Sequence, residues 1–195
     1  MTRSTIQNDL IRVAMVDDHA AVRLGLEAAI SSRPGLVSVG VVDGPEALAP
    51  LLYRARPDVV ILDYRLPRTN GLVLCRRVKA QPLAPAVLLY SAYADQALVV
   101  PALLAGADGL VHKGGPAREL LDAIRVVAGG GRWLPPLSPD LLRDAGTALD
   151  PEDLPVLGML SEGTPRPEIA ATLRLDAAEL DQRIGRMLAS LRPER

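Results

Sequence analysis

The chain has 195 residues, 49% of them hydrophobic and 23% charged, with a formal net charge of −1 at pH 7. This length suits one or two globular domains, and the near-neutral charge provides no global basic field to attract nucleic acid. The longest apolar run is far shorter than the roughly 18 residues of a membrane span, and the N-terminus lacks a signal-peptide core. We therefore expect a cytoplasmic protein without a membrane partner. The single cysteine, Cys75, excludes an internal disulfide, and its apolar neighbours favour a buried helix position over a reactive thiol.

Short apolar runs alternate with helical periods from residue 11 onward. The predicted strands are 11–16, 37–42, 59–62, 86–90 and 110–112, and the predicted helices are 21–30, 45–55, 72–80, 95–105 and 117–128. The run 59–62 is apolar throughout and follows a Pro-Asp pair, which predicts a strand buried on both faces. Five β/α units in about 120 residues predict an α/β fold with a doubly wound, five-stranded parallel sheet.

Polar side chains follow four of these strands at the point where each strand ends. Asp17 and Asp18 follow the first strand, Asp63 the third, Ser91 the fourth and Lys113 the fifth. The carboxyl ends of parallel strands share one edge of the sheet, where α/β proteins bind ligands. Clustered carboxylates repel one another unless a cation neutralises them, and their oxygens suit Mg²⁺. A helix-capping role would explain the first acidic pair alone, but not the other strand ends.

Residues 10–129 resemble the receiver domain of two-component response regulators. Each matching motif is short, but their order and spacing together are specific. The motifs are Val16-Asp17-Asp18-His19, Leu62-Asp63-Tyr64-Arg65-Leu66-Pro67 with Gly71, Tyr90-Ser91-Ala92, and Gly106-Ala107-Asp108-Gly109 before Lys113.

The resemblance implies a role for each strand-end residue. Asp63 would accept a phosphoryl group from a histidine kinase and form an aspartyl phosphate. The ligands of Mg²⁺ would be Asp17, Asp18, Asp63 and the backbone carbonyl of Arg65. The phosphate contacts would be Ser91, the backbone of Ala92, and Lys113. An ordinary turn hydroxyl and a solvated strand-end lysine are the alternatives for Ser91 and Lys113.

Two residues depart from the receiver pattern. Receivers usually carry Tyr or Phe on the fifth strand, three residues before the lysine, as the residue that reports phosphorylation. The corresponding switch position here is Leu110, so the aromatic relay is absent. Pro101 lies within the predicted fourth helix, where it removes a backbone donor and is expected to kink or shorten the helix.

A Gly- and Pro-rich stretch, 130–148, is predicted to be a linker with a short helix over 137–145. Residues 149–195 resemble the helix-turn-helix output domain of LuxR/FixJ (NarL-like) regulators. The scaffold helix is marked by Glu168-Ile169-Ala170 with Leu173 and Leu175, and the recognition helix by Glu179-Leu180 with Ile184, Leu188 and Leu191. The same apolar spacing would also suit another small helical bundle.

The charge of residues 149–195 is unusual for a DNA-binding domain. The segment has six Arg and no Lys against nine acidic residues, whereas phosphate contacts normally supply most of the affinity. The recognition helix starts with Glu179-Leu180-Asp181, where the family usually has Thr-Val-Lys. Arg183 and Arg186 are the candidate DNA contacts, with exposed surface charges as the alternative.

We interpret the chain as a response regulator, not an enzyme, that a histidine kinase phosphorylates and that acts on transcription through DNA. The alternative is a phospho-regulated protein-interaction module whose output domain has lost DNA binding. A magnesium-dependent phosphatase built on Asp63 would need a second acid at short spacing, and none is evident. The resemblance also implies a homodimer, although the family's fourth output helix, which supports dimerisation, would lie beyond Arg195.

Overall fold

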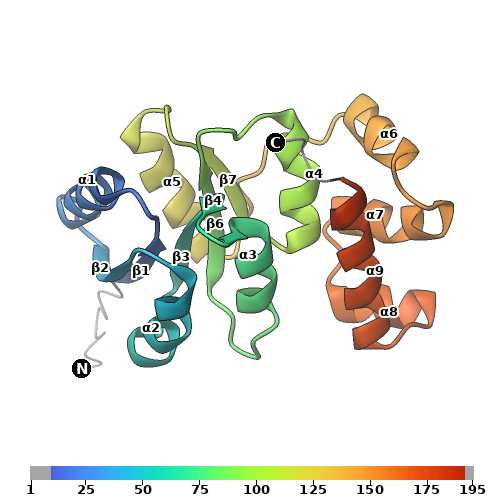
Figure 1. The fold of residues 1–195 in the computed structure, drawn as a ribbon, viewed down its shortest axis with the longest axis horizontal. Helices are drawn as coiled ribbons and strands as arrows, with labels where there is room; N and C mark the ends of the chain where they lie inside the picture. Colours follow the sequence, from blue (N-terminus) through green and yellow to red (C-terminus); the bar gives the residue numbers. More distant parts are fainter. Residues whose placement is uncertain (1–9, 192–195) are drawn as a thin grey trace, which may run out of the picture.

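The computed structural model describes residues 10–191. Its larger part is a five-stranded parallel sheet covered by helices on both faces (Figure 1). The strand order is β2-β1-β3-β6-β7, with β1 (Ile11–Val16), β2 (Leu36–Val42), β3 (Val59–Asp63), β6 (Ala86–Ser91) and β7 (Gly109–His112). The predicted α/β fold with a doubly wound sheet is confirmed. Strand β3 lies at the centre, and all five of its residues are buried.

Two hydrophobic cores lie on opposite faces of the sheet. One is formed with α1 (Ala20–Ser31) and α5 (Ala117–Ala128), and the other with α2 (Leu48–Ala55), α3 (Gly71–Lys79) and α4 (Gln96–Ala105). A small hairpin of β4 (Arg65–Leu66) and β5 (Thr69–Asn70) joins β3 to α3. Cys75 is buried on α3 as predicted, and burial raises the pKa of its thiol to about 12. The cysteine is therefore a packing residue.

Two prolines affect the helices differently from expectation. The predicted helix 45–55 is divided into a 3₁₀ turn, η1 (Pro45–Ala47), and α2, because an α-helix from residue 45 would set the ring of Pro50 against the carbonyl of Glu46. The expected shortening at Pro101 is wrong, since α4 continues through it to Ala105. Eight of the ten residues of α4 are buried, and this packing offsets the lost hydrogen bond.

The C-terminal part is all helical. It contains α6 (Pro139–Thr147), the 3₁₀ turn η2 (Pro151–Asp153), α7 (Leu154–Ser161), α8 (Arg166–Leu173) and α9 (Ala177–Ser190). Helix α6 corresponds to the predicted linker helix, and α8 and α9 to the predicted scaffold and recognition helices. A capping box between Asp176 and Glu179 starts α9. The N-terminal residues used for the signal-peptide prediction and residues 192–195 of the output segment lie outside the described residues.

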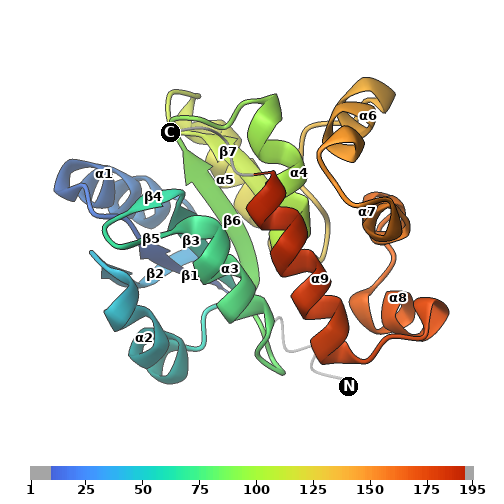
Figure 2. The same ribbon diagram turned by 45° about the vertical axis from the view of Figure 1, so that its right-hand side comes forward.

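Helix α4 joins the two parts. Its residues Val100, Leu103 and Leu104 share a third hydrophobic core with residues of α7 and α9, such as Leu157 and Ile184. Figure 2 shows α9 beside α4, with α3 close by. The C-terminal helices therefore cover the side of α4 that faces away from the sheet. Within residues 10–191, no helix combines the length and apolar character needed to cross a membrane.

Candidate functional site

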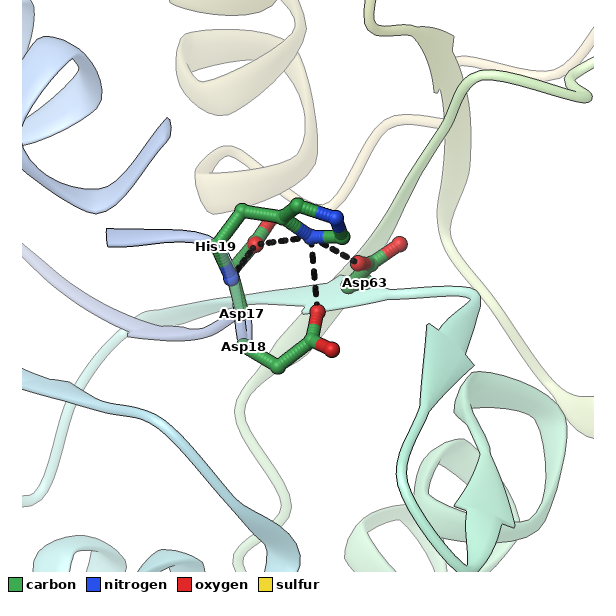
Figure 3. Close-up of side chains that lie close together, drawn as sticks. All are labelled: Asp17, Asp18, His19 and Asp63. Carbon is green, nitrogen blue, oxygen red and sulfur yellow. Dashed lines mark hydrogen bonds and ion pairs between the residues drawn. The ribbon is translucent and has the colours of Figure 1, made fainter. Parts of the chain in front are cut away.

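The predicted carboxylates meet at the carboxyl edge of the sheet. Val16 pairs with Leu62 in the parallel register of β1 and β3, so Asp17 and Asp63 follow at neighbouring strand ends. Both are buried, with relative exposures of 1% and 3%, whereas Asp18 is exposed. One carboxylate oxygen from each lies within 4.8 Å of the others and of a nitrogen of His19 (Figure 3). The structure thus brings together the three predicted carboxylates.

Lys113 joins this cluster from the end of β7. Its Nζ lies 2.7 Å from Asp17 Oδ2 and 2.7 Å from Asp63 Oδ2. Its backbone N–H donates to the carbonyl of Ser91 at 2.8 Å, which fixes the lysine beside β6. Burial by itself lowers the pKa of Lys113, but its contacts with Asp17 and Asp63 outweigh burial and leave that pKa raised. The lysine is therefore held in its charged form against the two buried carboxylates.

Asp63 remains incompletely neutralised. Burial raises its pKa, the contact with Lys113 opposes this rise, and the nearby Asp17 adds to it. Asp63 Oδ1 accepts a hydrogen bond from the N–H of Arg65 at 3.2 Å. Asp63 Oδ2 is buried and has its ion pair with Lys113, but no aligned hydrogen bond from the described residues. A divalent cation would fit this cluster, because it would complete the compensation of carboxylate charge that one ammonium group leaves unfinished.

A cavity of about 280 Å³ opens above Asp63, lined by His19, Val22, Asp63, Arg65, Ser91, Ala92, Tyr93 and Lys113. Ser91 is buried, and its Oγ accepts a hydrogen bond from the N–H of Tyr93 at 2.9 Å. The guanidinium of Arg65 stacks on the ring of Tyr93, 4.0 Å from its centroid. Sequence patterns could not reveal this stack at the cavity wall, because it joins β4 to the turn after β6, and these two segments are far apart in the chain.

Gly71 explains how α3 can start directly beside the site. A Cβ atom at this position would lie 2.6 Å from the carbonyl oxygen of Asp63 and 3.0 Å from Cα of Tyr64. The N–H of Gly71 also donates to the carbonyl of Tyr64 at 2.8 Å. A glycine at this point lets α3 approach the end of β3 and close the β4–β5 hairpin that carries Arg65.

Leu110 and His19 were singled out in different ways by the sequence. Leu110, the predicted switch position, is a buried core residue on β7, where it packs in the core of α2, α3 and α4. His19 was quoted within a motif but given no role, although its Nδ1 lies 2.7 Å from Asp18 Oδ1. Its place directly after Asp17 and Asp18, at the start of α1, is the signal that could have identified it.

The charged residues of α9 are engaged within the chain. The guanidinium groups of Arg183 and Arg186 lie 3.6 and 3.9 Å from the buried carboxylate of Asp153. The carboxylate of Asp181 lies 2.7 Å from the guanidinium of Arg76 on α3 and 3.8 Å from that of Arg166 on α8. The start of α9 is thus tied to the sheet-containing part of the molecule.

Known proteins share this organisation. A family model of the response regulator receiver domain matches residues 13–125. The DNA-binding transcriptional activator DevR/DosR of Mycobacterium tuberculosis is 33% identical over 196 residues, which cover 95% of this chain and 90% of that protein. A LuxR-family response regulator from Aurantimonas sp. SI85-9A1 has a TM-score of 0.60 at 30% identity and covers 70% of this chain and 95% of its own.

A further solved structure shares the fold over both parts of the chain. RcsB of Salmonella enterica serovar Typhimurium, solved bound to a promoter, has a TM-score of 0.62 at 22% identity, and covers 95% of this chain and 94% of its own. This likeness concerns the fold alone. The receiver-domain match covers more than half of the chain, and the likeness to DevR/DosR extends through the C-terminal helices. The chain therefore belongs to the response regulators of the receiver-domain family.

Proposed function

We propose that a histidine kinase phosphorylates this protein on Asp63 and that the modified protein controls transcription through its C-terminal helices. The observation that carries the proposal is the buried carboxylate of Asp63, at the base of an open cavity and 2.7 Å from the ammonium group of Lys113. In the transfer, a carboxylate oxygen attacks the phosphorus, the N–P bond of the phosphohistidine breaks, and the imidazole of the kinase takes up a proton.

The neighbouring groups suit a receiver of phosphate. Lys113 would shift its ammonium group toward the new phosphoryl oxygens, and Ser91 Oγ and the backbone of Ala92 would contact them from the cavity wall. The ligands of Mg²⁺ would be Asp17, Asp18, Asp63 and the backbone carbonyl of Arg65, and the ion would reduce the repulsion between phosphoryl and carboxylate oxygens.

The output function rests on the relatives. DevR/DosR is a DNA-binding transcriptional activator, and its similarity covers 95% of this chain, which includes most of the C-terminal helices. The proposed boundaries are 10–129 for the receiver, 130–148 for the linker and 149–195 for the output domain. Arg183 and Arg186 would serve as DNA contacts only after leaving Asp153. A homodimer would be the form that binds DNA.

A second function is favoured by one observation. Where the family usually has a lysine that can contact a DNA phosphate, this chain has Asp181, whose carboxylate pairs with Arg76 and Arg166. Helix α9 also packs on α4. A protein whose recognition helix is committed to its own receiver in this way would act as a phospho-regulated protein-interaction module without DNA binding. The two functions share the same phosphorylated residue and differ only in what α9 contacts.

The experiment treats the whole chain with a small phosphodonor and Mg²⁺, and then measures phosphoryl incorporation and salt-dependent DNA binding. Wild-type protein should incorporate one phosphoryl group, and Asp63→Asn none. Asp140→Asn is the matched control, because Asp140 is an exposed carboxylate on α6. Labelling of Asp63→Asn at another residue would refute the phosphoacceptor assignment. DNA binding that stays weak after phosphorylation would favour the protein-interaction function.

A further inference from the structure

The imidazole of His19 faces the carboxylate cluster. Its Nδ1 lies 2.7 Å from Asp18 Oδ1, 3.4 Å from Asp17 Oδ1 and 3.9 Å from Asp63 Oδ2 (Figure 3). The backbone N–H of His19 donates to Asp17 Oδ1 at 2.8 Å, so the residue is anchored to the same carboxylate. The nitrogen and the three oxygens therefore form one set of possible donors.

The spacing of these atoms matches the coordination sphere of a small divalent ion. With donors about 2.1 Å from an octahedral ion, neighbouring donors are about 3 Å apart and opposite donors about 4.2 Å apart. The separations from Nδ1 to the Asp17 and Asp63 oxygens, 3.4 and 3.9 Å, fall between these two values, and the 2.7 Å separation to Asp18 is about 0.3 Å shorter than the smaller one. The imidazole can thus bind the same ion as the carboxylates after only a small adjustment.

A separate observation indicates that the cluster is suited to a cation. Asp63 Oδ2 is buried and lacks an aligned hydrogen bond from the described residues, although it has an ion pair with Lys113. The ammonium group of Lys113 pairs with both Asp17 and Asp63 at 2.7 Å. Among the contacts of the described residues, it has no ion pair with Asp18. The carboxylate charge of the cluster therefore exceeds the positive charge that Lys113 supplies.

We propose that His19 is an additional protein ligand at this site and that its nitrogen shifts the metal preference from Mg²⁺ toward Ni²⁺, Co²⁺ and Zn²⁺. This rests on the metal site of the proposed function. Oxygen ligands suit Mg²⁺, which dehydrates reluctantly and keeps several waters, so an imidazole adds little to its binding. A neutral imidazole suits the later transition ions, whose affinity for a nitrogen-containing site follows the Irving–Williams order.

The experiment measures Ni²⁺ and Mg²⁺ binding to the untagged whole chain by calorimetry. His19→Phe keeps a planar ring but removes the donor, and should weaken Ni²⁺ at least about tenfold while changing Mg²⁺ by less than about twofold. His112→Phe is the matched control, because His112 is exposed and its Nδ1 accepts the N–H of Gly114 outside the cluster. It should change neither affinity. Equal effects of His19→Phe on both ions, or no effect, would overturn the proposal.

A spectroscopic measurement separates ligation from an indirect effect. Pulsed electron paramagnetic resonance of bound Cu²⁺, a paramagnetic later transition ion that also favours nitrogen donors, should show ¹⁴N modulation from imidazole in the wild type and in His112→Phe, and none in His19→Phe. His19→Asn, which replaces the nitrogen donor with an amide, should lose the signal as well and guards against misfolding of the Phe variant. Unchanged binding of both ions to Asp63→Asn would instead refute the metal site itself, which distinguishes failure of the proposed function from failure of the ligand assignment.

Discussion

Replacing Asp181 by lysine is the most informative change to α9, because the charge at this position affects both the docking of α9 on the receiver and its attraction to DNA. Its carboxylate lies 2.7 Å from the guanidinium of Arg76, and its backbone carbonyl accepts a hydrogen bond from the same group at 2.9 Å. Arg166 lies 3.8 Å from the carboxylate and also donates to the carbonyl of Leu104 at the end of α4. Asp181→Lys therefore places a third cation beside two guanidinium groups and, if α9 binds DNA, adds a phosphate contact.

The cost of this change to the docking of α9 follows from exposure and charge. The side chains of Asp181 and Arg76 are 55% and 25% exposed, so their ion pair stabilises the contact by roughly 0.5–1 kcal/mol. Repulsion between the new lysine and each arginine costs at most about 1 kcal/mol at 4 Å in water. The flexible lysine side chain can turn away from the arginines, which reduces this repulsion. The total cost to docking is about 2 kcal/mol, which shifts the equilibrium between docked and undocked α9 about thirtyfold toward the undocked form. Asp181→Asn should lose only the ion pair, which is less than about fivefold.

Hydrogen exchange of the backbone amides in α3, α4 and α9 measures docking, and a salt titration with a DNA duplex measures the new phosphate contact. Asp181→Lys should speed exchange more than Asp181→Asn, tighten DNA binding and steepen its salt dependence by up to about one counterion unit. Unchanged exchange in Asp181→Lys would show that these charges do not hold α9. Faster exchange without any change in DNA affinity would favour the protein-interaction function.

Three further predictions test the site and its support. Gly71→Ala should lower the free energy of unfolding in urea by at least about 2 kcal/mol, because the added Cβ would meet the carbonyl of Asp63. The control Gly25→Ala should raise it by up to about 1 kcal/mol, because a Cβ at this position of α1 has open space around it. Asp63→Asn should raise the melting temperature near pH 8, and this gain should shrink as pH falls toward about 4. Burial raises the pKa of the wild-type Asp63 carboxyl, so its charged form destabilises the folded state at high pH. Protonation at low pH removes that destabilisation from the wild type. Replacing Asp17 and Asp18 together by Asn should weaken Mg²⁺ binding in calorimetry, and unchanged affinity would contradict their role as ligands.

The sheet and the cluster at its edge were predictable because both follow from local patterns. The apolar run at 59–62 predicts a central strand, and Asp63 at its end must then lie at the ligand-binding edge of the sheet. Helix boundaries were less certain where proline acts through geometry. Pro50 shifts the start of α2 because its ring excludes an earlier helix, while Pro101 is retained within α4 because burial of the surrounding residues outweighs one missing hydrogen bond.

The docking of α9 could not be predicted, because it depends on pairs that are far apart in the chain. The net charge of 149–195 indicates weak attraction to DNA. It does not reveal that Asp181 contacts Arg76, which lies 105 positions earlier in the sequence. The sequence pattern of α4 offers a physical clue, since its apolar residues occupy every side of the helix, and the sheet can bury only one of them. An all-apolar helix at the edge of such a sheet requires a second covering layer, and in this chain α7 and α9 supply it. Undocking the C-terminal helices would expose the apolar surface that Val100, Leu103 and Leu104 form on α4. A new partner for that surface would therefore lower the cost of releasing α9 for DNA binding.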